Sequence, residues 1–117
     1  MSHTQKVLTT KRLTGSLALL MACSSALATT DNSKTINLLG VQGGGTSAQV
    51  YFSVVEGFSL NCQFSNIYVD ITTDFGRGAY AQLLVAKNSG RQLSRIDYTQ
   101  AGGPGTECVL NLVEVAN

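Results

Sequence analysis

The chain has 117 residues, of which 44% are hydrophobic and 13% are charged, and its formal net charge is +1. This length provides one hydrophobic core rather than two, since domains of roughly 100–150 residues are the norm. The balanced charge excludes a disordered polyelectrolyte, and it lacks the excess of Lys and Arg that nucleic-acid-binding proteins carry.

The first 28 residues have the pattern of an export signal. Basic residues open the chain, residues 13–27 form an apolar stretch, and Ala26-Leu27-Ala28 presents small residues where a signal peptidase cuts. The stretch falls short of the ~20 apolar residues of a membrane span. We therefore expect a signal peptide over residues 1–28, cleavage after Ala28, and a mature protein in the periplasm or secreted, without a transmembrane segment. A buried N-terminal helix is the alternative for the same residues.

The sequence Leu20-Met21-Ala22-Cys23 is similar to a bacterial lipobox and supports a second interpretation of the N-terminus. In that case Cys23 is lipidated, becomes the first mature residue and anchors the protein in the envelope. Met is unusual at the second position of this motif, and small residues suited to cleavage follow just downstream. We therefore favour cleavage after Ala28.

Three strands are expected before the only helix. Residues 29–34 are polar and are interpreted as a flexible N-terminal segment. Residues 35–41 alternate as a strand does, and the polar Gly-rich run at 42–47 predicts a hairpin connection. Residues 49–55 and 64–71 predict the second and third strands. Their inward side chains are Val50, Phe52 and Val54 in the second strand, and Ile67, Val69 and Ile71 in the third.

The segment after the third strand predicts an amphipathic helix. Thr72-Thr73-Asp74 offers three candidate N-caps, and from Phe75 onward apolar residues recur every three or four positions. Gly90 is placed to be a left-handed C-cap. Gly76 and Gly78 each cost about 1 kcal/mol relative to Ala. We therefore expect the start of the helix to pack closely against a sheet or another subunit.

The remaining elements complete a recognisable order. Residues 92–99 predict a fourth strand, residues 101–106 a loop and residues 107–116 a last strand, which is apolar on both faces as central strands are. Three strands, a helix and two strands follow one another in the OB-fold, a five-stranded Greek-key barrel. We predict a mainly β fold with one α-helix, an OB-like five-stranded barrel forming a single domain over residues 35–117. A ferredoxin-like fold needs an earlier helix, and a plain β-sandwich does not explain the capped one.

Two cysteines, Cys62 and Cys108, remain after removal of the signal. An even number of cysteines in a small exported domain indicates a disulfide. Closing a loop of about 46 residues stabilises a chain by about 4 kcal/mol in the chain-entropy model. The alternatives are two buried free thiols or a catalytic thiol, and the only histidine, His3, leaves with the signal.

The composition of the mature segment argues against catalysis. Without histidine, Ser-His-Asp and Cys-His mechanisms are excluded, and two distant cysteines make no zinc site. The carboxylates available for a glycosidase pair are Glu56, Asp70, Asp74 and Asp97. They are better explained as a strand-face charge, a helix cap and solvated positions. Five basic residues against seven acidic ones leave a net charge of about −2. We expect no enzyme, no cofactor, no metal and no nucleic-acid partner.

The helix carries a signature that extends over residues 73–91. It consists of Gly76-Arg77, then Tyr80, then Leu83-Leu84-Val85-Ala86-Lys87-Asn88-Ser89-Gly90-Arg91. This signature resembles that of a group of small exported bacterial proteins of unknown function, which also tend to have cysteines at the places of Cys62 and Cys108. More loosely, the chain is similar to the B subunits of subtilase-type AB5 toxins. That similarity implies a disulfide-containing OB-fold that assembles into glycan-binding pentamers.

These observations predict an exported, non-catalytic binding or assembly module whose partners are a glycan or further copies of itself. Tyr51, Tyr68 and Tyr98 alternate with core positions, and the aromatic faces of OB-folds stack bases or sugars. Tyr51 and Tyr68 are the candidate ligand-binding residues. The plainer interpretation places these tyrosines at a barrel rim or subunit contact. The alternative function is a monomeric structural protein of the envelope, or a lipoprotein anchored through Cys23.

Overall fold

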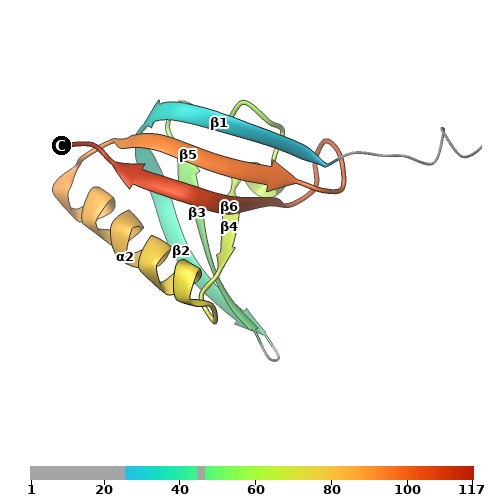
Figure 1. Ribbon diagram of the computed structural model, residues 1–117, viewed down its shortest axis with the longest axis horizontal. Helices are drawn as coiled ribbons and strands as arrows, with labels where there is room; N and C mark the ends of the chain where they lie inside the picture. Colours follow the sequence, from blue (N-terminus) through green and yellow to red (C-terminus); the bar gives the residue numbers. More distant parts are fainter. Residues whose placement is uncertain (1–25, 45–46) are drawn as a thin grey trace, which may run out of the picture.

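A computed structural model describes residues 26–44 and 47–117 of the chain. These residues form one six-stranded sheet and one α-helix (Figure 1). The elements in chain order are β1 (Leu27–Lys34), β2 (Ile36–Gly44), β3 (Ser47–Val54), the short 3-10 helix η1 (Gln63–Ser65), β4 (Ile67–Asp70), α2 (Asp74–Ser89), β5 (Leu93–Gln100) and β6 (Cys108–Val115). The prediction of a mainly β fold with one α-helix is confirmed, whereas the prediction of five strands is wrong.

The sheet has the strand order β1-β5-β6-β4-β3-β2, and only the β4–β6 pair is parallel. Thr35 alone separates β1 from β2, so the two strands at opposite ends of this order are consecutive in the chain. The Glu56 carboxylate accepts hydrogen bonds from the backbone N–H and the hydroxyl of Thr35, both at 2.8 Å. The sheet therefore curls around a common interior, and its two ends meet at Thr35 (Figure 1).

β1 is the additional strand. The sequence predicts a flexible segment over residues 29–34, but the structure pairs these residues with β5, in a ladder that runs from Leu27 opposite Gln100 to Lys34 opposite Leu93. The buried residue of this strand is Asp31, whose carboxylate is hydrogen-bonded inside the chain. A polar segment can thus form a strand when its inward side chain finds polar partners.

The predicted N-terminal processing falls at the limit of the described residues. Residues 1–25, which include Cys23, lie outside them. The predicted cleavage after Ala28 falls inside β1, where it would remove Leu27 and Ala28 and leave the residue pairs from Thr29 opposite Tyr98 onward. Cleavage and lipidation both stay predictions.

The core lies inside the curled sheet and is closed by α2. The residues predicted to point inward in the second and third strands are buried in β3 and β4, except Ile71, which follows β4 and is only partly buried. The helix contributes Ala79, Leu83 and Ala86. α2 contacts β2, β4 and β6, and it runs across one side of the sheet (Figure 1). β6 lies between β5 and β4, as expected of a strand that is apolar on both faces.

The helix ends as its sequence predicts. The Thr73 hydroxyl accepts a hydrogen bond of 2.9 Å from the N–H of Gly76, and Gly90 adopts the left-handed conformation with φ 71°. A Cβ atom at Gly76 would lie 1.8 Å from the carbonyl oxygen of Asp70, so the expected close packing is confirmed there. Gly78 has nothing within 4 Å of its Cβ position, so it does not pack against the sheet, and packing of Gly78 against another subunit stays a prediction.

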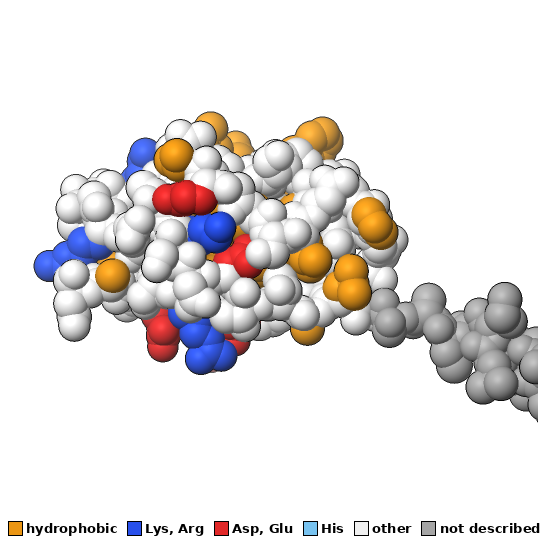
Figure 2. All heavy atoms as spheres, turned by 90° about the horizontal axis from the view of Figure 1, so that it is seen from above, with side chains coloured by type: hydrophobic (Ala, Val, Ile, Leu, Met, Phe, Trp, Pro, Cys, Tyr) orange, Lys and Arg blue, Asp and Glu red, His pale blue; other side chains and the backbone are white. Residues whose placement is uncertain are grey.

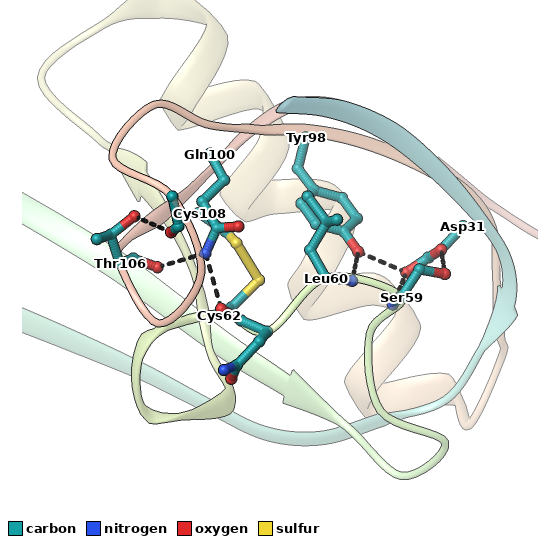
Figure 3. The surroundings of a disulfide bond; sticks show 10 residues. Asp31, Ser59, Leu60, Cys62, Tyr98, Gln100, Thr106 and Cys108 are labelled. Atoms are coloured by element: carbon teal, nitrogen blue, oxygen red, sulfur yellow. Dashed lines mark hydrogen bonds between the residues drawn. A yellow bond between two sulfur atoms is a disulfide. The ribbon is translucent and has the colours of Figure 1, made fainter. Parts of the chain in front are cut away.

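The predicted disulfide is confirmed. Cys62 precedes β4, Cys108 opens β6, and their Cα atoms are 5.4 Å apart across a sequence separation of 46. The bond therefore joins the loop between β3 and β4 to the first residue of β6 (Figure 3). No helix among the described residues has both the length and the apolar character that crossing a membrane requires.

Candidate functional site

A row of paired residues crosses the outer face of the sheet. Gly40 of β2 pairs with Tyr51 of β3, Tyr51 pairs with Tyr68 of β4, and Tyr68 pairs with Val109 of β6. Residues opposite each other in register present their side chains on the same face. The ring centroids of Tyr51 and Tyr68 are 6.2 Å apart and the ring planes are tilted by 44°. The structure thus brings the two predicted ligand-binding tyrosines together.

The position of the Tyr51 ring depends on Gly40. A Cβ atom at residue 40 would lie 2.4 Å from Cζ and 2.5 Å from the hydroxyl oxygen of Tyr51. The ring therefore lies directly against the backbone of β2, where any larger residue would displace it. With Tyr68 on its other side, Tyr51 is held between two neighbouring strands.

A hollow of about 300 Å³ lies beside this pair, which is the lower end of the usual size of ligand pockets. Its described lining combines three aromatic rings, three carboxamides and one carboxylate. These residues are Gln42, Tyr51, Gln63, Phe64, Asn66, Tyr68 and Glu107, and we call the space they enclose the tyrosine hollow.

Phe64 lies at the tyrosine hollow with 78% of its surface exposed. It adopts the left-handed conformation with φ 54°, and Ser65 follows with φ 57°. Such backbone conformations cost a residue with a side chain of order 1–3 kcal/mol. The turn is supported by hydrogen bonds from Ser65 N–H to the Cys62 carbonyl at 3.0 Å and from Asn66 N–H to the Gln63 carbonyl at 3.1 Å. A large apolar ring is thus held in water beside two tyrosines.

Most polar side chains of the tyrosine hollow have no hydrogen-bond partner among the described residues, although Tyr68 is only 6% exposed. Gln42 donates a hydrogen bond of 3.3 Å to Gln49. The side chains of the other polar lining residues make no hydrogen bond with any other residue that the structure describes; these are Tyr51, Gln63, Asn66, Tyr68 and Glu107. Their amide, hydroxyl and carboxylate groups supply both donors and acceptors.

The walls of the tyrosine hollow are tied together next to the disulfide. Gln63 follows Cys62 in the chain and Glu107 precedes Cys108, so the covalent bond links the two walls. The Gln63 N–H donates to the Thr106 carbonyl at 2.9 Å. The buried Gln100 side chain donates to the carbonyls of Asn61 at 2.7 Å and Thr106 at 3.0 Å (Figure 3). Both walls are therefore fixed relative to each other.

Tyr98 does not belong to this site, although the sequence groups it with Tyr51 and Tyr68. Its side chain points inward with no exposed surface. Its hydroxyl donates to Asp31 at 2.8 Å and accepts from the Leu60 N–H at 3.2 Å (Figure 3). It lies in the core because Asp31 and the loop after β3 provide the hydrogen bonds that a buried hydroxyl needs.

We call Asp31, Ser59 and Tyr98 the inner cluster, and the surroundings shift the pKa values of Asp31 and Tyr98. Burial, reinforced by the Asp31 carboxylate, raises the pKa of Tyr98 to about 12. Burial also acts to raise the pKa of Asp31, but hydrogen bonds from the Ser59 hydroxyl, the Ser59 N–H and Tyr98 outweigh it. The pKa of Asp31 is therefore lower than usual, and its carboxylate is charged at neutral pH.

Each of the four carboxylates considered for a glycosidase pair is bound by its own local partner. Glu56 is bound by Thr35, and Asp70 accepts from the N–H and hydroxyl of Thr72. Asp74 pairs with Arg77, and Asp97 pairs with Arg95 at 2.8 Å. On the face seen in Figure 2, acidic and basic side chains lie beside one another rather than in patches of one sign. Within residues 26–44 and 47–117, no three Asp, Glu, Cys or His side chains gather as a metal site requires.

Most of the lining of the tyrosine hollow is not predicted from the sequence. Gln63, Phe64 and Asn66 lie in the loop and turn before β4, and Glu107 ends the loop before β6. The sequence places Phe64 and Asn66 in the third strand and Glu107 in the last, and these strand starts are wrong, because β4 begins at Ile67 after the 3-10 turn and β6 begins at Cys108. The one available signal is their position beside the predicted disulfide, because side chains next to two bridged cysteines must lie near each other.

Comparison with models of known protein families, with curated proteins and with solved structures gives no match for this chain.

Proposed function

We propose that the protein is a non-catalytic binding module whose ligand is a saccharide held in the tyrosine hollow. The observation that supports this most directly is the lining itself, with the rings of Tyr51, Phe64 and Tyr68 beside carboxamides. Aromatic rings contact the apolar C–H faces of a sugar, while carboxamides both donate to and accept from its hydroxyls. Such a ligand needs no catalytic group and no metal.

The topology supports the further proposal that the sheet is an OB-fold barrel. If β1 and β2 count as one long strand bent at Thr35, that strand pairs with β3 on one side and β5 on the other. The third and fifth strands of such a barrel are then β4 and β6, the parallel pair, and α2 follows the third. OB-folds bind oligosaccharides on the face of their second and third strands. Tyr51 and Tyr68 lie on those two strands, β3 and β4.

The disulfide supports export of the mature protein to the periplasm or the medium, because such bonds persist in oxidising compartments.

Assembly with further copies of the chain is supported by large apolar side chains left exposed on β2 and α2. These are Leu38, Val41, Phe75 and Val85. Light scattering on the size-separated oxidised protein measures the assembly directly: a multiple of the chain mass supports it, and a monomer contradicts it.

The binding proposal is tested with a glycan array followed by titration calorimetry on the oxidised protein. We expect Tyr51→Ala and Phe64→Ala to weaken the best array ligand about tenfold, since stacking on an aromatic ring is worth about 1–3 kcal/mol. Phe64 is a suitable probe because its exposed side chain contributes little to the core. Phe75→Ala removes another exposed ring, which belongs to α2 and does not line the tyrosine hollow, and should leave binding unchanged. If Tyr51→Ala and Phe64→Ala bind the ligand as tightly as Phe75→Ala and the wild type do, the tyrosine hollow is not the binding site.

A further inference from the structure

We infer that the saccharide bound in the tyrosine hollow carries a positive charge, as an amino sugar with a free ammonium group does. This inference rests on the proposed function and adds the chemical class of the ligand. It starts from the charges around the hollow. Glu107 is the one formally charged residue among the described lining, and that lining contains neither Lys nor Arg.

The basic side chains of the described residues all lie outside the lining of the tyrosine hollow. Arg77 pairs with Asp74, Arg95 pairs with Asp97, and Lys87 donates to the Asn37 carbonyl at 3.0 Å. None of these residues lines the tyrosine hollow, and neither do Lys34 or Arg91. Glu107 forms no ion pair with a described residue, so a ligand cation would be its partner.

A second carboxylate increases the negative potential of this face. Asp70 lies two residues after Tyr68 on β4, and the two share a face because side chains alternate along a strand. Hydrogen bonds from the hydroxyl and N–H of Thr72 lower the pKa of Asp70, which keeps it ionised. An acidic sugar approaching the tyrosine hollow would meet two carboxylates and no base.

The aromatic rings act in the same direction as the carboxylates. The face of an aromatic ring attracts a cation placed within about 6 Å of its centroid. Tyr51 is the more accessible of the two rings, since Tyr68 is only 6% exposed, so an ammonium group in the tyrosine hollow would lie against Tyr51. The same group satisfies Glu107, while the hydroxyls of the sugar meet Gln42, Gln63 and Asn66. An N-acetylated sugar retains the stacking but loses the charge.

The test compares two tetrasaccharides with the same backbone, one of glucosamine and one of N-acetylglucosamine, with tetragalacturonate as the acidic probe. Titration calorimetry is done on the oxidised protein at low salt and about pH 6, where amines are protonated. We expect the glucosamine tetramer to bind about tenfold tighter than the acetylated one, and the acidic probe not to bind. Added salt should narrow the difference.

Glu107→Gln tests the carboxylate itself. We expect this change to weaken the glucosamine tetramer about three- to tenfold and to leave the acetylated tetramer unaffected. Glu114→Gln is the matched control, since it neutralises another exposed glutamate of the same C-terminal segment that does not line the tyrosine hollow.

The outcomes separate this inference from the proposed function. Equal or tighter binding of the acetylated tetramer, or no effect of Glu107→Gln, overturns the positive charge and leaves a saccharide site in place. Failure of all three tetrasaccharides, together with an empty glycan array, overturns saccharide binding itself.

Discussion

Tyr98 and the Tyr51–Tyr68 pair show two uses of one side chain within a single sheet. Tyr98 points into the core with no exposed surface, and its hydroxyl both donates and accepts within the chain. Tyr51 and Tyr68 point outward beside a hollow, and their hydroxyls bind no other described residue. The hydrogen-bonding capacity of Tyr98 is thus used within the fold, whereas the hydroxyls of Tyr51 and Tyr68 have no partner among the described residues, as the proposed binding site requires.

The disulfide is connected to both regions, since Cys62 lies in the loop that carries Ser59 and Leu60 and precedes Gln63 of the tyrosine hollow. Its removal should have the largest effect on stability. The double variant Cys62→Ala/Cys108→Ala is expected to lose about 2–5 kcal/mol of unfolding free energy, since the unfolded chain gains freedom. Saccharide binding should weaken as well, because the walls carrying Gln63 and Glu107 are no longer linked. Urea unfolding measures the first effect and calorimetry below the unfolding transition the second. Wild-type protein under reducing conditions should match the variant, and an unchanged urea midpoint would contradict the stabilising role.

The inner cluster alone is tested by Asp31→Ala. This change leaves the Tyr98 hydroxyl and the Ser59 N–H without their acceptor, so we expect a loss of about 2–3 kcal/mol of unfolding free energy. Binding at the outer hollow should not change in the folded protein. Asp97→Ala is the control, because it removes a carboxylate from an exposed ion pair, and its effect should be much smaller. Equal losses in the two variants would show that the buried network does not stabilise the fold.

The inner cluster also predicts how stability depends on pH. The lowered pKa of Asp31 gives stability that is fully present above about pH 4, the ordinary value for the carboxyl group, and is lost as the pH falls through its folded value. The raised pKa of Tyr98 makes the unfolding free energy decrease as the pH rises, which is the opposite dependence. The unfolded chain ionises there first, so stability falls by about 2 kcal/mol between about pH 10 and 12. Thermal unfolding across the pH range measures both, and Tyr98→Phe should remove the alkaline component. A flat stability profile in the wild type above pH 10 would be the contrary result.

The smallest expected change in stability tests the outer pair. Gly40→Ala places a Cβ where the Tyr51 ring lies, so the ring should move while the backbone stays in place. We expect saccharide affinity to fall several-fold with a loss of under about 1 kcal/mol in unfolding free energy. Gly43→Ala on the same strand has open space and serves as the control. Unchanged affinity in Gly40→Ala would show that the position of Tyr51 does not matter for binding.

The sequence predicts the elements whose signals are local. The alternation in β3, the Thr73 and Gly90 caps of α2, and the paired cysteines each depend on short patterns or simple counting, and each is confirmed. β1 escapes prediction because its buried side chain is a carboxylate. Asp31 becomes an inward residue only through Ser59 and Tyr98, which are 28 and 67 positions away.

The sequence also predicts only those residues of the candidate site that lie at regular positions of a strand. Tyr51 and Tyr68 follow from strand alternation, which gives their face but not their pairing partners. Phe64 and Glu107 lie in irregular segments, so tertiary structure alone brings them to the tyrosines. Tyr98 shows the converse error, because a tyrosine at a regular position of a strand faces the core when the interior supplies hydrogen bonds for its hydroxyl.

The long-range pairing of β1 determines when the N-terminal strand can fold. β2 can pair with β3 across a short hairpin. β1 can pair only with β5, in which Leu27 lies opposite Gln100 and Lys34 lies opposite Leu93. During synthesis β1 therefore emerges before the other described strands and can pair only after β5 has been made. The peptide bond after Ala28 is part of a paired strand in the finished sheet. Cleavage at the predicted position after Ala28 would therefore have to precede the pairing of β1 with β5.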